Sequence, residues 1–223
     1  MNKLYVIPTP IGNLKDITYR SIDVLKSVEY ICAEDTRTTK KLLNHYNINN
    51  KLISYHQHNE HKVADKIIED LLVKEGDVAV VSDAGTPGIS DPGFLLVKKA
   101  KEKDIPVFCL PGATAFIPAL IQSGFPSDIF IFYGFLPHKK GRTKAINKIK
   151  EEKTTIILYE SPHRLLKLLK ELDEVFQENR EVSISREISK IHEETISGTP
   201  QQLFKHFSQK KIKGEIVVVI RKE

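Results

Sequence analysis

The chain has 223 residues, of which 40% are hydrophobic and 28% charged, a balance typical of globular proteins and unlike that of disordered chains. No stretch approaches the ~20 consecutive apolar residues of a membrane helix, and the apolar run at residues 4–7 is too short for the core of a signal peptide. The two cysteines, Cys32 and Cys109, make neither a disulfide framework nor a zinc-ligand pattern. We therefore expect a soluble, cytoplasmic protein.

The charge of the chain is unevenly distributed. The net charge is +5, yet residues 1–126 hold 15 basic and 15 acidic side chains, whereas residues 127–223 hold 19 and 14. The whole positive excess therefore lies in the second part. It indicates either a polyanionic partner that docks mainly there or a general contribution to solubility.

Strand-like and helix-like segments alternate along the chain. Apolar residues recur at helical spacing in residues 63–72 and 165–176. Helix starts are expected at Asp91-Pro92, Ser161-Pro162 and Thr199-Pro200, because in each case a capping side chain precedes a proline at the first helical position. Apolar runs predict strands at residues 4–7, 30–33, 51–54, 78–82, 107–110, 129–133, 155–159, 182–185, 193–197 and 216–220.

This order of segments predicts an α/β protein of two domains. Alternating strands and helices in the first part predict a mostly parallel sheet with helices on both faces. The last strands are joined by short connections, which predicts a mixed sheet in a second α/β domain. The turn-rich stretch at residues 122–126 is the expected boundary, so we predict an N-terminal cofactor-binding domain at residues 1–121 and a C-terminal domain at residues 122–223.

Ligands of open α/β sheets bind beyond the carboxyl ends of the strands, so the loops after the strands are the candidate binding segments. The loop at residues 8–13 lacks the G-x-G-x-x-G pattern, and the chain has no P-loop motif. The loop at residues 83–93 holds three glycines and two prolines, which permit a close backbone approach to a ligand and hold the loop rigid. Its Asp83 could accept hydrogen bonds from ribose hydroxyls or an ammonium group, or could simply cap a structural turn. Residues 111–115 form another small-residue turn, whose N–H groups could face a ligand.

Five motifs in a fixed order carry a resemblance to a known family. They are Pro-Thr-Pro-Ile-Gly-Asn-Leu at 8–14, Ala-Glu-Asp-Thr-Arg at 33–37, Ser-Asp-Ala-Gly-Thr-Pro-Gly-Ile-Ser-Asp-Pro-Gly at 82–93, Leu-Pro-Gly-Ala-Thr-Ala at 110–115 and Tyr-Glu-Ser-Pro-His-Arg at 159–164. The set resembles the tetrapyrrole methylase superfamily. More closely, it is similar to the bacterial small-subunit ribosomal RNA methyltransferase I family, which methylates the ribose 2′-oxygen of a cytidine in 16S rRNA.

The resemblance implies a homodimeric enzyme that binds S-adenosylmethionine between its two domains and acts on the small ribosomal subunit. Family members commonly carry a further C-terminal segment beyond the last strand of this chain. If that segment grips RNA, this protein must grip RNA differently or rely on the subunit to present the target. The implied cofactor contacts are Pro10, Asp83, Ala84, Gly85, Thr86, Thr114 and Ala115 and, by looser alignment, Glu160 and Gly214.

Methyl transfer to a ribose hydroxyl, a very weak acid, is helped by a general base or by a cation that stabilises the developing alkoxide. In the Tyr-Glu-Ser-Pro-His-Arg motif, Glu160 or His163 could accept the proton, while Arg164 could hold a phosphate bidentately. The alternative is a salt bridge between Glu160 and Arg164, with His163 on the surface. A second polar cluster is expected at residues 186–187 and 192–194, for which an ion-paired network is the equal alternative.

Three segments could contact RNA. Arg37 and Lys40 lie on one basic helical face, and residues 139–144 form the densest positive patch. The histidine-rich segment at residues 56–61 lacks the helical His-x-x-x-His spacing of a metal site, so we expect no metal there and instead stacking of Tyr55 and its histidines on bases. The predicted RNA-binding residues are Arg37, Lys40, His58, Lys139, Lys140 and Arg142.

Two other functions remain open at this point. The same fold and cofactor could serve a small-molecule methyltransferase that acts on a tetrapyrrole precursor. Alternatively, the chain could be a ribosome-binding factor without catalytic activity, which would have little need for the glycine-rich loop.

Overall fold

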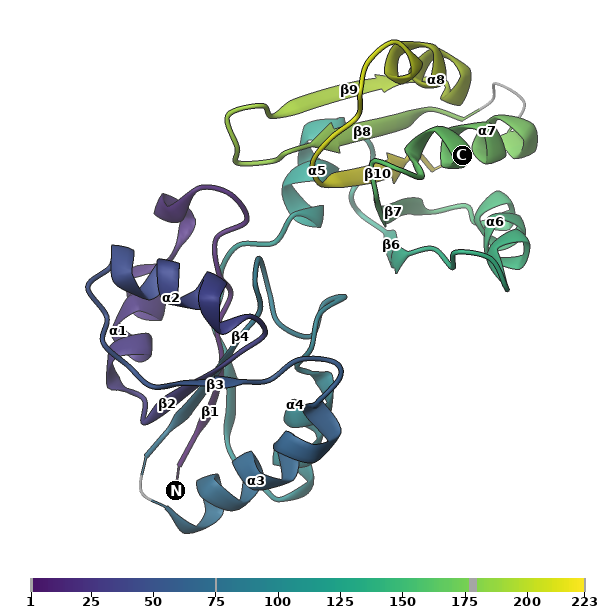
Figure 1. Ribbon diagram of the computed structural model, residues 1–223. Coiled ribbons are helices and arrows are strands. Elements are labelled where there is room, and N and C mark those ends of the chain that lie inside the picture. Colours follow the sequence, from purple (N-terminus) through teal and green to yellow (C-terminus); the bar gives the residue numbers. More distant parts are fainter. Residues whose placement is uncertain (1, 75, 177–179, 223) are drawn as a thin grey trace. The chain divides into compact units, whose positions relative to one another are not determined.

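The computed structural model describes residues 2–74, 76–176 and 180–222. The chain forms two compact units, Met1–Thr114 and Ala115–Glu223. Both are α/β units (Figure 1), as predicted.

A five-stranded sheet forms the centre of the first unit (Figure 1). Its strands follow the order β3-β2-β4-β1-β5, and every pairing between neighbours is parallel. This confirms the predicted parallel sheet. The strands are β1 (Leu4–Val6), β2 (Tyr30–Ala33), β3 (Leu52–Ser54), β4 (Val78–Val81) and β5 (Val107–Cys109).

Helices cover both faces of this sheet, because its central strands are apolar on both sides. Leu25 of α1 and Leu43 of α2 pack with Ile31 and Val81 on one face. Ile67 of α3 and Leu96 of α4 belong to the core on the other face. The helices are α1 (Tyr19–Ser27), α2 (Thr36–His45), α3 (Glu60–Val73) and α4 (Phe94–Glu102), and a short 3-10 helix, Leu14–Asp16, precedes α1.

The second unit holds a mixed five-stranded sheet of order β6-β7-β10-β8-β9. β6 is parallel to β7, whereas β10 is antiparallel to both β7 and β8, and β8 is antiparallel to β9. This confirms the predicted mixed sheet. The strands are β6 (Phe130–Phe135), β7 (Thr155–Glu160), β8 (Val182–Arg186), β9 (Glu194–Gly198) and β10 (Ile216–Ile220).

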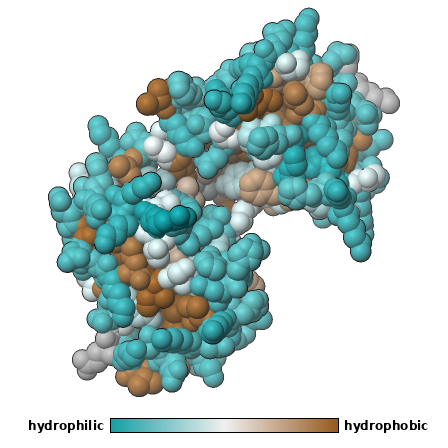
Figure 2. Space-filling view, viewed as in Figure 1, coloured by the Kyte–Doolittle hydropathy of each residue, from teal (hydrophilic) through white to brown (hydrophobic). Residues whose placement is uncertain are grey.

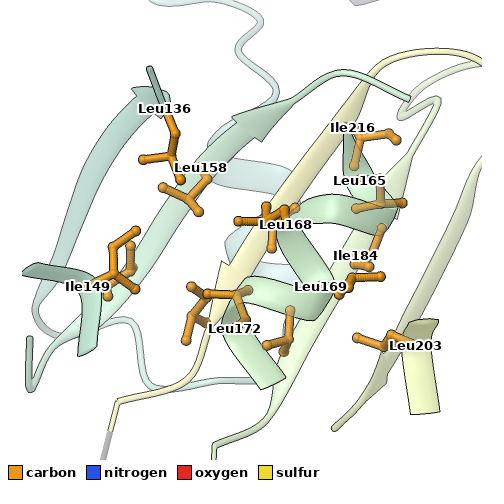
Figure 3. Close-up of a cluster of buried hydrophobic side chains, with 14 of the residues drawn as sticks. Leu136, Ile149, Leu158, Leu165, Leu168, Leu169, Leu172, Ile184, Leu203 and Ile216 are labelled. Atoms are coloured by element: carbon orange, nitrogen blue, oxygen red, sulfur yellow. The ribbon is translucent and has the colours of Figure 1, made fainter. Parts of the chain in front are cut away.

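Three helices, α6 (Arg142–Glu151), α7 (Leu165–Phe176) and α8 (Pro200–Ser208), bury their apolar side chains against one face of this sheet. Figure 3 shows Leu168 and Leu172 of α7 beside Leu158 and Ile184 of the strands. Helix α5 (Phe116–Ser123) packs against strands of the same sheet and therefore belongs with the second unit. The unit boundary thus precedes α5, whereas the boundary expected from the sequence follows residue 121.

The three expected helix starts have different outcomes. Thr199 caps α8, its side chain and that of Gln202 form a capping box, and Pro200 is the first helical residue, as predicted. The other two predictions are wrong. Helix α4 begins only at Phe94, because the backbone of Gly93 has a φ of +143°, and α7 begins at Leu165, after a turn in which the Ser161 carbonyl accepts the N–H of Arg164.

Hydrophilic side chains dominate the surface that is visible in Figure 2. Within the described ranges, no helix is both long and apolar enough to cross a bilayer.

Candidate active site

Three loops meet at the carboxyl edge of the first sheet, where the sequence places the binding site. β1 and β4 are neighbours, and the loops that follow them are joined by a two-residue bridge. The N–H of Thr9 donates to the carbonyl of Gly85 and the N–H of Gly85 donates to the carbonyl of Thr9, both at 2.9 Å. The third loop follows β5, and the Thr86 hydroxyl donates to its Ala113 carbonyl at 3.0 Å. The three segments are therefore held as one rigid rim, which we call the cradle (residues 8–10, 82–86 and 110–114).

Two buried hydroxyl groups donate hydrogen bonds to backbone carbonyls of the cradle. The side chain of Thr9 is buried and donates to the Ser82 carbonyl at 3.0 Å. The Ser82 hydroxyl, also buried, donates to the Gly85 carbonyl at 3.3 Å. These bonds satisfy carbonyls at the bend of the chain, and an unsatisfied buried carbonyl would cost about 1–3 kcal/mol.

Two glycines allow the loops to approach each other. Gly85 has a φ of +83°, a left-handed conformation that a side chain would oppose. Gly112 has no such φ, but a Cβ added there would lie 2.6 Å from the Cβ of Pro8. The contact between the loops after β1 and β5 therefore requires glycine, and the predicted contact residues Pro10, Ala84 and Thr114 are all half-buried along this rim.

Acidic side chains lie just after the carboxyl ends of β2 and β4, and one of them, Asp83, belongs to the cradle. Glu34 follows β2 and Asp83 follows β4. The N–H of Asp83 donates to Oε2 of Glu34 at 3.2 Å, and the N–H of Asp35 donates to Oδ1 of Asp83 at 3.0 Å. Burial raises the pKa of Glu34, and the nearby negative charge of Asp83 raises it further. Partial burial of its carboxyl group likewise raises the pKa of Asp83.

Asp35 behaves differently because a cation holds it. Its carboxylate accepts hydrogen bonds from the Arg37 side chain, with a shortest distance of 2.7 Å, and from the Arg37 backbone N–H at 2.8 Å. These bonds lower the pKa of Asp35 to about 2. Asp35 is thus the N-cap of α2, whereas Asp83 remains exposed and has no hydrogen bond to its Oδ2 from the part of the chain that the structure describes.

In the second unit, Glu160 lies at the carboxyl end of β7 inside a buried ionic network. Its side chain is fully buried, and Oε1 lies 2.7 Å from Nη2 of Arg164. Oε2 lies 3.6 Å from Nη2 of Arg142, which also pairs bidentately with Glu171 at 2.7–2.9 Å. The two guanidinium groups donate in turn to the carbonyls of Leu136 and Pro137 at the end of β6. The network therefore ties β6, β7 and α7 together.

This arrangement separates the three predicted catalytic residues. Glu160 and Arg164 form the salt bridge that was the alternative to a catalytic role, whereas Oε2 of Glu160 and Nε of Arg164 are buried without a hydrogen-bond partner in the described part of the chain. His163 is exposed, one residue before Arg164 on the turn that the network fixes. Of the three, only His163 keeps a side chain open to solvent.

A second ionic cluster lies on the same edge of this sheet. The register places Glu160, Ile216 and Arg186 in one row across β7, β10 and β8. Just beyond, Lys190 contacts Glu187 at 2.8 Å and Glu215 at 3.1 Å, and the nearby Lys190 lowers the pKa of Glu187.

Gly214 is part of this second cluster. Its φ is +88°, and an added Cβ would lie 2.3 Å from the carboxylate of Glu187. The absence of a side chain at position 214 thus makes room for Glu187.

Comparison with known proteins places this geometry in a family. Residues 3–203 match the family model described as Tetrapyrrole (Corrin/Porphyrin) Methylases. A protein of Halalkalibacterium halodurans named ribosomal RNA small subunit methyltransferase I is 48% identical over 97% of this chain and 75% of its own length. A protein of the same name from Thermotoga maritima is 45% identical over 99% of this chain and 98% of its own length. The chain belongs to the ribosomal RNA small subunit methyltransferase I family of tetrapyrrole methylases.

Solved structures of tetrapyrrole methylases share the fold. The cobalt precorrin-4 methyltransferase of cobalamin biosynthesis superimposes with a TM-score of 0.70 at 16% identity, over 97% of this chain and 94% of its own. A uroporphyrin-III C-methyltransferase of Thermus thermophilus, complexed with S-adenosylhomocysteine, gives a TM-score of 0.67 at 14% identity, over 99% of this chain and 97% of its own. The two α/β domains of this chain are therefore those of the tetrapyrrole methylase family.

The residues expected to bind RNA in this methylase lie in different environments. Lys40, His58, Lys139 and Lys140 are exposed, as an RNA contact requires. Arg37 is also exposed, although its guanidinium pairs with Asp35.

Arg142 is buried, and its guanidinium is used by Glu171 and Glu160, so it is unavailable to RNA, contrary to prediction. Tyr55 is fully buried in the core between the first sheet and α3, so it cannot stack on a base. In the described ranges, no group of three or more His, Cys, Asp or Glu side chains is placed to hold a metal ion.

Sequence reasoning did not single out several residues that shape the methylase site. Thr9 and Ser82 lie inside the quoted motifs, so their position after β1 and β4 could have marked them as hydroxyls that tie the loops together. Glu34 lies inside the quoted motif at residues 33–37, but the sequence alone assigned it no role in the site. Glu171 carries no local signal, because it lies 29 residues from Arg142 and only the packing of α7 beside α6 joins them.

Proposed function

We propose that this chain uses S-adenosylmethionine to methylate the ribose 2′-hydroxyl of a cytidine in 16S rRNA of the small ribosomal subunit. The observation that carries the proposal is the 45–48% identity, over 97–99% of the chain, to proteins named ribosomal RNA small subunit methyltransferase I. Structural similarity at 13–17% identity supports the fold alone. We propose further that the protein works as a homodimer in the cytoplasm.

The cradle fits the cofactor chemically. S-adenosylmethionine carries ribose hydroxyls and an ammonium group but no phosphate, so it calls for carboxylates and backbone groups and not for a P-loop. Asp83 offers an exposed carboxylate oxygen, and Gly85 leaves the space that a Cβ would fill. We assign the adenosyl and amino acid parts to Pro10, Asp83, Ala84, Gly85 and Thr86, with Thr114, Ala115, Glu160 and Gly214 as the further contacts that the family implies.

When bound, the cofactor supplies an electrophilic methyl group on a sulfonium. The residues of the chain must orient the ribose and take up its proton. Because Glu160 is locked between two guanidinium groups, we propose that it positions Arg164 and the turn and does not act as the base. His163, on that turn and exposed, is the group that takes the proton at an imidazole nitrogen. We keep Arg37, Lys40, His58, Lys139 and Lys140 as RNA contacts.

The test is methyl transfer from labelled S-adenosylmethionine. Purified protein is incubated with small ribosomal subunits from a strain that lacks the gene, or with tetrapyrrole precursors. We expect label in 16S rRNA alone. Label in the tetrapyrrole alone would establish the small-molecule alternative, and binding to subunits without transfer would establish the non-catalytic one.

A matched pair of variants connects the activity to the cradle. Asp83→Asn keeps an acceptor for the Asp35 N–H but removes the charge, and we expect loss of cofactor binding in calorimetry together with loss of transfer. Asp23→Asn changes an exposed carboxylate on α1 and should leave both unchanged. Unchanged cofactor affinity in Asp83→Asn would overturn the assignment of the cradle.

A further inference from the structure

Residues 139–150 carry a high density of positive charge. They include five lysines and Arg142 and no acidic residue. Arg142 is neutralised inside the protein, whereas Lys139, Lys140, Lys144 and Lys148 are all exposed. We call these four residues the lysine surface. In the described part of the chain, none of them has a carboxylate within ion-pair distance.

Two other helices place an acidic residue one turn after a lysine. Lys98 of α4 has Glu102 one turn further along at 3.8 Å, and Lys167 of α7 has Glu171 at the same spacing and distance. On α6 the position one turn after Lys144 is occupied by Lys148 instead. Two like charges at this spacing destabilise a helix by ~0.2–0.5 kcal/mol, so the arrangement works against the stability of α6.

The packing of α6 fixes where these charges point. Arg142, Ile146 and Ile149 form the buried stripe of the helix, and Lys144 and Lys148 lie outside it, about 6 Å apart along the axis. The Nζ of Lys148 lies 5.4 Å from the centre of the Tyr133 ring on β6, which restrains that side chain. The surface over α6 is hydrophilic in Figure 2. A ridge of unpaired ammonium groups on a rigid helix is therefore presented to the solvent.

We propose that the lysine surface docks the phosphate backbone of RNA, and that Lys148, which lies outside the positive patch at residues 139–144, contacts RNA together with Lys144. The inference rests on the proposed function. The inference extends that function by placing RNA binding in the second unit. This agrees with the charge distribution, because the second unit has a net charge of +5 and residues 1–114 have a net charge of zero. Ammonium groups bind phosphates as point charges without reading bases, so the contacts contribute affinity and not sequence preference.

The experiment measures binding and turnover of the Lys144→Gln, Lys148→Gln double variant on purified small ribosomal subunits. At ~0.15 M salt we expect Kd and KM to rise about tenfold with kcat unchanged. Affinity should also depend less steeply on salt, with the magnitude of the slope of log affinity against log salt reduced by about 2. The Lys144→Arg, Lys148→Arg double variant keeps both charges and should bind as the unmodified protein does. It thereby separates loss of charge from damage to the helix.

The matched control is the Lys62→Gln, Lys66→Gln double variant on α3. These two lysines are exposed at the same spacing, but α3 also carries Glu60, Asp65, Glu69 and Asp70. We expect Kd to change less than twofold. Equal losses in the two Gln variants, or an unchanged salt slope in the α6 variant, would overturn the inference.

Two outcomes separate the inference from the function on which it rests. If the unmodified protein transfers methyl groups to 16S rRNA while the α6 variant matches it in KM, the inference fails and the function stands. If the unmodified protein transfers no methyl group to rRNA, the proposed function itself fails. Lysine-dependent binding to vesicles of anionic phospholipid, without binding to RNA, would likewise overturn the inference in favour of a membrane partner.

Discussion

At the scale of single residues, Glu160 shows how burial decides what a carboxylate can do. In the sequence it is an acidic side chain in a conspicuous motif, and a role as a base is the natural reading. In the structure it is fully buried between Arg164 and Arg142. The i,i+4 pairing of Glu160 with Arg164 could be predicted from the motif. The rest of the network, formed by Arg142 and Glu171, could not be predicted from the local sequence, because it depends on how α6 and α7 pack.

The buried network predicts a large effect of Glu160 on stability. In Glu160→Ala, two guanidinium groups lose their shared partner inside the protein, so we expect the free energy of unfolding in urea to fall by about 3–5 kcal/mol. Glu174→Ala removes an exposed carboxylate from α7 and should change it by no more than about 0.5 kcal/mol. If Glu160→Ala unfolded at the same urea concentration as the unmodified protein, the network would not have the stabilising role described here.

At the scale of secondary-structure elements, all ten strands lie where the apolar runs predict them, within about two residues at each end. Short buried strands leave a strong signal because each is apolar at consecutive positions. The predicted starts of α4 and α7 were wrong because a proline is compatible with the first turn of a helix but does not by itself start one. In the loop before α4, Gly88, Ser90 and Gly93 all have positive φ, so the backbone turns until residue 93 before helical geometry can begin.

The strand ends also depend on individual backbone positions, and Gly214 before β10 is the clearest case. In Gly214→Ala the positive φ alone costs about 1–2 kcal/mol, and the new Cβ must also displace the Glu187 carboxylate. Gly124→Ala is the matched control, because Gly124 has a φ of +68° with no atom within 4 Å of an added Cβ. We expect Gly214→Ala to lose clearly more free energy of unfolding than Gly124→Ala, and equal losses would contradict the placement of Glu187.

At the scale of the whole molecule, the alternation of segments is enough to predict two α/β units, and the order of motifs is enough to predict the family. The boundary between the units could not be placed as well, because α5 follows the last strand of the first sheet in the chain but packs against strands of the second. The charge difference between the two halves was visible in composition. Which lysines are unpaired became visible only with the burial of Arg142 and the exposed positions on α6.

The central claim is that this chain methylates the ribose of a cytidine in 16S rRNA. It is tested most directly by mapping 2′-O-methylation by mass spectrometry in 16S rRNA from cells without the gene, complemented either with the unmodified gene or with Asp83→Asn. The account predicts one cytidine that lacks its 2′-O-methyl group in the deletion strain, regains it with the unmodified gene and stays unmethylated with Asp83→Asn. An identical methylation pattern in all three strains would contradict it.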